Sequence, residues 1–254
     1  MNLVASLIVK NEIGRYLQPC IAHLQQFCDQ IIVVDDGSMD GTGEWLQDQE
    51  RVDVVPLPDV SEGFFAGHEG RRRQYLLDFT LNHHPDWVLA IDADEFITDP
   101  VALCDYIENS GREVGLLDME EVWKADDTQL SIRMDGGWRP HACPILWKTS
   151  LSGRRGQRLR IADKALACGR EPEAIRRYLG KARPTGSSIL HLGWAKQSGR
   201  QARYERYVTA DGGQFHRNSH LDSIMWPDEK IRLEEKLWPP LLERVRRQIV
   251  EAAS

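Results

Sequence analysis

Two carboxylates separated by one residue, Asp92 and Asp94, follow a short apolar run and are the clearest candidates for chemistry in this sequence. The run at 87–91 has the length and composition of a buried strand. Because side chains alternate along a strand, Asp92 and Asp94 should project to the same side. Two adjacent carboxylates repel each other unless a cation lies between them, and their hard oxygens favour Mg²⁺ or Mn²⁺. The alternative is a helix start, where acidic residues are also favourable.

The sequence before this pair alternates between apolar runs and amphipathic stretches. This alternation predicts an α/β fold with a parallel sheet and right-handed crossovers. Strands are predicted at 3–9, 30–34, 52–57 and 87–91, with helices at 13–27, 44–49 and 71–82 between them.

Polar clusters follow three of these predicted strands, at Lys10–Glu12, Asp35–Asp36 and Asp92–Asp94. Ligands of open parallel sheets bind outside the carboxyl ends of the strands. Three clusters at equivalent strand ends should therefore meet in one crevice, which favours a ligand or metal site over a helix cap for the acidic pair.

The second half of the chain is less regular. It predicts a helix at 101–108, strands at 114–122, 145–147 and 187–194, and a loop or hairpin at 123–140. Helices follow at 200–209 and at 227–252, the latter broken at Pro239–Pro240. We expect an α/β half at 1–98, a second half of the same domain at 99–195 and a C-terminal helical extension at 196–254.

Composition excludes several classes of protein. The 254 residues carry a formal net charge of −7, which argues against a protein that coats nucleic acid, although basic runs occur at 71–73 and 154–160. Five cysteines without a CxxC pattern predict reduced thiols. We see neither a signal peptide nor a membrane-spanning run and expect a cytoplasmic protein, with peripheral membrane contact left open.

Familiar phosphate-binding motifs are missing where they would be needed. The first strand is followed by Lys-Asn-Glu-Ile-Gly rather than GxGxxG, and no GxxxxGK[ST] occurs. Ser38-Met-Asp-Gly-Thr42 comes close to the aspartyl-phosphate motif DxDGT, but serine replaces the nucleophile. Dinucleotide-binding, P-loop and aspartyl-phosphate chemistries are therefore not supported.

Four stretches together resemble family 2 glycosyltransferases with a GT-A fold, which has a mostly parallel, Rossmann-like sheet flanked by helices. The second of them matches the VVDDGSxDGT signature closely, and the last is the metal-binding DxD segment in its DADE form. The four stretches lie at 6–12, 31–42, 70–74 and 87–95, in the order and spacing of the family. Beyond residue 100 the resemblance is weak.

The resemblance implies a nucleoside diphosphate sugar as donor and Mn²⁺ or Mg²⁺ as cofactor. It also implies that residues 1–98 form the sugar-nucleotide-binding half and residues 99–195 the acceptor-binding half. It assigns Asp92, Asp94 and the late His191 to the metal, with Asp92 closer to the ribose or sharing the ion. Imidazole suits Mn²⁺ better than Mg²⁺, and the alternative for His191 is a core histidine bonded to the backbone. The residues expected to bind the donor nucleotide are Val9, Lys10, Glu12, Asp35, Asp36, Arg72, Arg73 and Asp92.

Other roles follow less directly from the resemblance. Lys196, Arg200 and Arg203 are expected to close over the diphosphate, or else to form an exposed helix face. Most family members invert the anomeric centre and need a general base to deprotonate the acceptor. We assign this base to Glu171, with Asp94 and Glu95 beside it in the catalytic centre. The other candidates are Glu120, Glu121, Asp163 and Glu173.

The acceptor is open: a glycan, a lipid-linked saccharide, a protein or modified DNA all fit, and nucleic acid is possible but not favoured. Two alternative functions also remain. A sugar-phosphate nucleotidyltransferase shares the sheet type but normally has a Gly-rich, Arg-containing loop after the first strand, which this chain lacks. A non-catalytic module that binds sugar nucleotides or glycans would not need the acidic pair.

Overall fold

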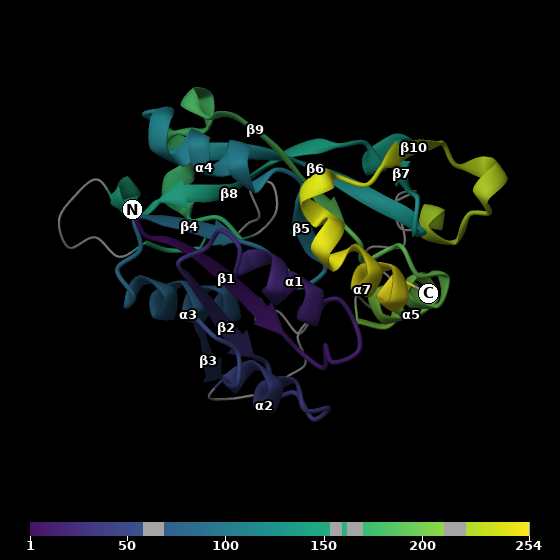
Figure 1. The fold of residues 1–254 in the computed structure, drawn as a ribbon, viewed down its shortest axis with the longest axis horizontal. Coiled ribbons are helices and arrows are strands. Elements are labelled where there is room, and N and C mark those ends of the chain that lie inside the picture. Colours follow the sequence, from purple (N-terminus) through teal and green to yellow (C-terminus); the bar gives the residue numbers. More distant parts are fainter. Residues whose placement is uncertain (58–68, 153–158, 162–169, 211–221, 254) are drawn as a thin grey trace.

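A computed structural model describes residues 1–57, 69–152, 159–161, 170–210 and 222–253. A single ten-stranded sheet runs through the molecule (Figure 1). Its first part consists of parallel strands in the order β3-β2-β1-β4, as the alternating pattern predicts. Their bounds are β1 Leu3–Val9, β2 Gln30–Asp35, β3 Val52–Pro56 and β4 Trp87–Ala90.

The second part of the sheet pairs mainly antiparallel. β8 (His141–Lys148) joins β4 to β6 (Val114–Ala125), and β7 (Gln129–Arg133) forms a hairpin with β6. β9 (Arg183–His191) lies parallel to β6 and antiparallel to the short β5 (Glu95–Ile97). The α/β fold class is thus confirmed, with the parallel pairing concentrated in the first half.

Helices cover both faces of the parallel strands. Alternate residues of β1 face opposite ways: Leu3, Ala5 and Leu7 share one core with α1, while Val4 and Ile8 share another with α3. The α-helices are α1 Leu17–Leu24, α2 Thr42–Gln47, α3 Glu69–Leu81, α4 Pro100–Asn109, α5 Gln197–Ala210 and α7 Glu243–Ala253. Short 3₁₀ helices lie at Gly136–Trp138, Thr149–Ser152, Glu173–Arg177, Leu179–Lys181, Ser223–Met225, Asp228–Lys230 and Pro240–Leu242.

The predicted helix at 227–252 is wrong over its first half. Residues Leu233–Leu237 form strand β10, which pairs with β7 at the edge of the sheet, and the helix begins only at Glu243. The segment LEEKL has good helix formers, but the hydrogen bonds offered by the open edge of β7 outweigh that local preference. The remainder of the predicted helix, α7, packs against α1 through Ile249 and its neighbours.

Some sequence features fall outside the described residues. These include Cys168, Asp163 and residues 153–158 of the basic run. Cys20, Cys28, Cys104 and Cys143 are free thiols, as expected. Among the helices that the structure describes, none combines the length and apolar character needed to cross a membrane.

Candidate active site

The loops that follow β1 and β2 are tied together by side-chain hydrogen bonds. The Asn11 backbone N–H donates to Ser38 Oγ at 2.9 Å, and the Met39 N–H donates to Asn11 Oδ1 at 2.8 Å. Asp40 accepts from the Ile13 N–H at 3.1 Å and from Thr42 Oγ1 at 2.6 Å. Residues 38–42 therefore hold the two loops in register, rather than projecting freely into a crevice.

Asp35 and Asp36 lie at the end of β2 in different surroundings. Asp36 is fully buried and pairs with Arg72 Nε at 3.0 Å and Lys10 Nζ at 3.6 Å. Asp35 accepts from Ser38, and a Cβ atom built on Gly43 would come within 2.8 Å of its Oδ2 atom. Glycine at 43 is thus needed for the close approach of the Asp35 carboxylate.

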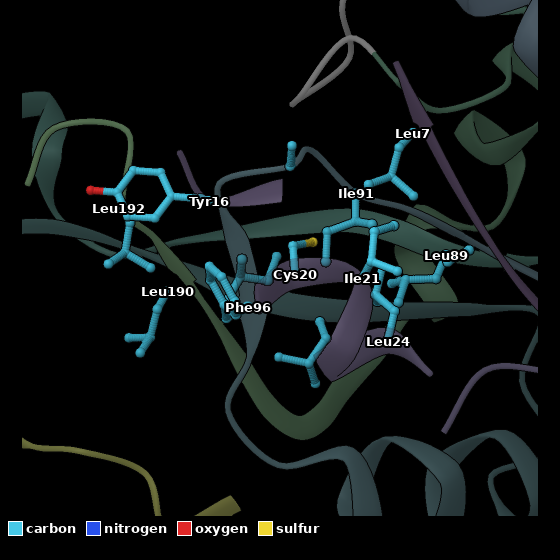
Figure 2. Packing of buried hydrophobic residues seen from close by; sticks show 14 of the residues in the cluster. Leu7, Tyr16, Cys20, Ile21, Leu24, Leu89, Ile91, Phe96, Leu190 and Leu192 are labelled. Atoms are coloured by element: carbon cyan, nitrogen blue, oxygen red, sulfur yellow. The ribbon is translucent and has the colours of Figure 1, made fainter. Parts of the chain in front are cut away.

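The acidic pair lies in a turn between β4 and β5, and no helix begins there. The helix cap proposed as the alternative is found later, where Asp99 accepts from the Ala102 N–H at 3.0 Å at the start of α4. Helix α1 contacts the turn: Cys20 Sγ lies 3.9 and 3.7 Å from the carbonyl oxygens of Asp92 and Glu95. Figure 2 shows Cys20 in the apolar cluster that also contains Ile91 and Phe96, which lie before and after the turn in sequence. The Asp92 N–H donates to Glu95 Oε2 at 3.0 Å, which closes the turn.

Arginines neutralise Asp92 and Glu95. Arg73 Nη1 lies 3.1 Å from Asp92 Oδ1, and Arg170 Nη1 lies 3.4 Å from Asp92 Oδ2. Arg170 also binds Glu95 with both of its terminal nitrogens, at 2.6 and 2.8 Å. Burial opposes ionisation of Asp92, but Arg170 and Arg73 outweigh it and lower the pKa of this carboxyl. For Glu95, burial dominates and raises the pKa despite Arg170.

Asp94 and His191 face each other across the strands. Asp94 Oδ2 lies 3.6 Å from His191 Nε2 and 2.5 Å from Arg203 Nη2. On its other side His191 Nδ1 lies 2.6 Å from Glu121 Oε2. Burial opposes both charges, yet His191 and Arg203 hold the pKa of Asp94 well below its usual value, while Glu121 and Asp94 hold the pKa of His191 well above.

The register of the strands explains why His191 lies close to acids from two other strands. His191 on β9 is the cross-strand partner of Glu95 on β5 and of Glu121 on β6. The three side chains therefore gather at one point, although they come from distant parts of the sequence. The alternative of a core histidine bonded to the backbone does not describe His191, because its ring contacts two carboxylates.

The donor atoms fit a divalent cation only in part. Within the described ranges, no group of three or more His, Cys, Asp or Glu side chains is arranged to hold a metal ion. Asp94 and His191 offer one oxygen and one nitrogen toward the same space, whereas both oxygens of Asp92 contact arginines. Two protein ligands are enough when substrate phosphates supply others, as is common for Mg²⁺. Asp94 and His191 therefore fit a cation that is shared with a phosphate-bearing substrate.

The residues predicted to close over a diphosphate have different positions. Arg203 on α5 reaches Asp94, but Arg200 is 8% exposed and its guanidinium lies over Trp123, 4.3 Å from the ring centroid. Lys196 is exposed just before α5. Arg203 is thus the member of this set that enters the acidic site.

Candidate general bases are also dispersed. Glu171 is completely buried and accepts from the Arg170 N–H at 2.9 Å, next to the Asp92–Glu95 cluster. Glu120 is held by Ser188 at 3.0 Å and Lys236 at 2.8 Å, and Glu173 is exposed. Glu121 contacts His191, as described above. Glu121 is therefore linked to the acidic turn through His191, and Glu171 follows directly after Arg170, which contacts Asp92 and Glu95.

Two residues of the site escaped prediction from sequence. Arg170 comes from the irregular, basic stretch 150–185, where no periodicity indicates which arginine turns inward. Tyr16 is 4% exposed, and no described residue hydrogen-bonds to its hydroxyl. Burial and the charge of Asp94 raise the pKa of this hydroxyl.

Comparison with known proteins agrees with this geometry. Residues 6–110 match the family described as "Glycosyl transferase family 2". The uncharacterized proteins Mb3815c of Mycobacterium bovis and Rv3786c of Mycobacterium tuberculosis are each 26% identical over 204 residues, which cover 78% of this chain and 48% of theirs. The chain thus spans about half the length of the curated relatives it matches.

Two solved structures have weak similarity to this chain. A 4-diphosphocytidyl-2C-methyl-D-erythritol synthase has a TM-score of 0.43 and 16% identity, and it covers 72% of this chain and 86% of its own. A glucosyl-3-phosphoglycerate synthase from Mycobacterium tuberculosis, in complex with Mn²⁺, UDP and glucosyl-3-phosphoglycerate, has a TM-score of 0.36 and 21% identity, with coverage of 46% and 44%. The family match at 6–110 includes β2, β4, most of β1 and the acidic turn, so this segment of the chain is similar to glycosyl transferase family 2.

Proposed function

We propose that this protein transfers a sugar from a nucleoside diphosphate sugar to an acceptor, with a divalent cation and with inversion at the anomeric carbon. The proposal rests on the pair formed by Asp94 and His191, whose side chains lie 3.6 Å apart. The pair lies at the edge of the sheet where β1, β2 and β4, the strands of the family-matched segment, have their carboxyl ends. An oxygen and an imidazole nitrogen are ligands that Mn²⁺ accepts. The same edge carries the polar residues that follow β1 and β2.

The nucleotide of the donor is assigned to the ends of β1 and β2. Asp35 is half-buried there, and Lys10 and Glu12 belong to a loop that residues 38–42 hold in place. Carboxylates accept hydrogen bonds from ribose hydroxyls or base N–H groups, and Lys10 supplies a positive charge for phosphate. Arg72 supports this part indirectly, since it is buried against Asp36.

The diphosphate is assigned to Asp94, His191 and Arg203. A divalent cation bound to Asp94 and His191 would stabilise the negative charge that develops on the leaving diphosphate. Glu121 holds the His191 ring through Nδ1 and so directs Nε2 toward Asp94. Arg170 positions Asp92 and Glu95 through three contacts.

Deprotonation of the acceptor is assigned to Glu171. Its carboxylate is buried and accepts from the backbone N–H of Arg170, the residue whose guanidinium contacts Asp92 and Glu95. Glu95 serves this step as a positioning residue, because both of its oxygens are bonded to Arg170. Glu171→Gln should lower sugar transfer much more than donor hydrolysis, since water needs less help from a base at that position.

Nucleotide binding is the first test of the proposal. Thermal-shift measurements with UDP, GDP, CMP and dTDP sugars and Mn²⁺ should show one class that raises the Tm, since a ligand of the folded state stabilises it by mass action. Release of the nucleoside diphosphate should then be measured with that donor. A protein that binds none of these donors and releases no nucleoside diphosphate is not a glycosyltransferase, and release of pyrophosphate from a nucleoside triphosphate would indicate a nucleotidyltransferase instead.

Removal of the cation ligands is the second test. Asp94→Asn should lower turnover by at least about a hundredfold while the fold stays intact, because the leaving group loses its electrostatic support. His191→Ala should raise the Mn²⁺ concentration needed for half-maximal activity. Asp118→Asn is the matched control, since Asp118 is exposed on β6. An unchanged Mn²⁺ titration in both site variants would remove the cation from this mechanism.

A further inference from the structure

The guanidinium of Arg203 occupies the space in front of Asp94. Its Nη2 atom lies 2.5 Å from Asp94 Oδ2, the oxygen that His191 Nε2 faces at 3.6 Å. One carboxylate oxygen is therefore the meeting point of an arginine and an imidazole. A cation ligated by this oxygen and by His191 would have to enter the space beside Arg203.

Gly193 leaves room for this guanidinium because it has no Cβ atom. A Cβ atom built on Gly193 would lie 2.5 Å from Arg203 Nη1 and 2.7 Å from both Cζ and Nη2. The guanidinium thus rests on the bare backbone two residues after His191. Any side chain at this position would push it away, at little cost to the rest of the fold, since the atoms that must move end a flexible side chain.

Aromatic rings fix the helix that carries Arg203. Arg203 Cζ lies 5.1 Å from the centroid of the Trp194 ring, and Arg200, one turn earlier on α5, lies 4.3 Å from that of Trp123. The rings of Trp123 and Trp194 each pack edge-to-face against the ring of Trp138. Cation–π contacts strengthen when the arginine is partly buried, so these two contacts hold α5 in a defined position over the site.

A divalent cation and the guanidinium exclude each other at Asp94 Oδ2. A metal ion bound to this oxygen would carry two positive charges within a few ångströms of Arg203 Nη2, in a largely buried site where such repulsion is poorly screened. The guanidinium would have to leave the oxygen. The negative group that becomes available to it is the diphosphate of the donor, which arrives with the cation.

We propose that Arg203 is an exchangeable cation, which occupies Asp94 before the metal ion binds and moves to the diphosphate when the donor arrives, and that Gly193 is the residue that positions it. The proposal rests on the proposed function, because it takes the ligand to be a divalent cation with a nucleoside diphosphate. Arg203 then opposes binding of the metal alone and favours binding of the metal together with the diphosphate.

Binding of Mn²⁺ alone tests the first half. Free Mn²⁺ can be followed by its electron paramagnetic resonance signal during titration of the protein without nucleotide. Arg203→Gln should bind Mn²⁺ about tenfold more tightly than the parent, since a charge-assisted contact to Asp94 no longer competes. Gly193→Ala should shift affinity in the same direction. In the double variant the two effects should not add, because both act through one contact.

Binding of UDP, GDP, CDP and dTDP in the presence of saturating Mn²⁺ tests the second half. The nucleotide that binds the parent best should bind Arg203→Gln several-fold more weakly. Opposite changes for Mn²⁺ and nucleotide distinguish exchange from general loosening of the site, which would weaken both. Gly180→Ala and Arg247→Gln are controls: a Cβ at Gly180 meets nothing within 4 Å, and Arg247 is exposed on α7.

Two outcomes would overturn the inference. The first is an unchanged Mn²⁺ affinity in both Arg203→Gln and Gly193→Ala, with melting curves that show folded protein. The second is the absence of Mn²⁺ binding in the parent and all variants. Either result leaves the proposed sugar transfer to be judged separately, by donor binding and release of nucleoside diphosphate in the parent protein.

Discussion

Four acids at the carboxyl edge of the parallel strands or in the turn after β4 have a basic partner within the chain. The pairs are Asp36 with Arg72, Asp92 with Arg73, Asp94 with Arg203 and Glu95 with Arg170. Buried charges are costly unless paired, so this arrangement lets the chain fold without a ligand. A donor diphosphate and a divalent cation would enter such a site together at little change in its net charge.

Glu12 differs from these paired acids. It contacts Arg15 at 2.8 Å, yet burial raises its pKa to about 7, and the neighbouring Asp94 adds to the increase. A carboxyl whose pKa is higher in the folded than in the unfolded protein stabilises the fold at low pH. That stability is lost as the pH rises from the unfolded value of 4.5 through 7, since the folded state must then give up a proton that it binds more tightly.

Glu12→Gln should therefore remove this pH dependence. Relative to the parent, the variant should gain up to about 3 kcal/mol of unfolding free energy between pH 4.5 and pH 8, with most of the change complete near pH 7. Urea denaturation at a series of pH values measures the difference. Glu44→Gln, an exposed residue of α2, is the control and should show no such trend. A constant difference between parent and Glu12→Gln would contradict the assignment.

At the scale of elements, side-chain hydrogen bonds connect the loops that follow β1 and β2. These bonds shape the part of the site to which the donor nucleotide is assigned in our proposal. Asp40 bonds to Ile13 in the loop after β1 and to Thr42 at the start of α2, and its pKa is lowered because these hydrogen bonds outweigh the effect of burial. Thr42 Oγ1 in turn accepts from the Glu12 N–H at 2.9 Å. The signature after β2 thus positions residues that belong to a different segment.

Asp40→Ala should loosen both loops. We expect a loss of about 1–2 kcal/mol of unfolding free energy, because three donors lose their acceptor at a partly exposed position. Nucleotide affinity should fall as well, since Lys10 and Glu12 are no longer held in place. Denaturation and nucleotide titration together measure the two effects. Asp127→Ala, in the exposed turn between β6 and β7, should change neither, and equal behaviour of the two variants would contradict this account.

Sequence patterns predicted the first part of the fold well and the second part less well. β1, β2 and β4 are continuous apolar runs that are buried on both faces, so composition alone marks them. β10 has the burial of an edge strand and the residues of a helix, and its structure depends on a partner that local sequence does not reveal. The family motifs predict that Asp92, Asp94 and His191 share a metal ion, and in the structure Asp94 faces His191 while Asp92 contacts arginines. The contacts of Arg170 and the close approach of Arg203 to Gly193 depend on tertiary packing, which the local sequence does not reveal.

At the scale of the whole molecule, the first and last helices share one core. Ile249 on α7 is completely buried in the cluster that contains Leu17, Ile21 and Leu24 of α1, and Figure 1 shows the two helices side by side. Helix α1 also contacts the acidic turn through Cys20. The packing of α7 against α1 therefore stabilises the helix that supports this turn.

Ile249→Ala should cost about 3 kcal/mol of unfolding free energy, the usual result of removing a buried aliphatic side chain and leaving a cavity. Chemical denaturation of the full chain measures this loss. Arg247→Ala, whose side chain is 88% exposed on the same helix, should cost far less. Similar losses in the two variants would show that α7 does not belong to the main core.

Strand β9 has a consequence for the order of folding. It is inserted between β5 and β6, so the short β5 gains its sheet partner only when residues 189–191 arrive. Arg203 and Asp94 are 109 residues apart in sequence. Contacts between residues so far apart in sequence form slowly, because closing the long loop between them costs conformational entropy before the contacts can offset it. In refolding experiments Mn²⁺ binding should therefore appear after the parallel strands have formed, as one of the last properties that the protein acquires.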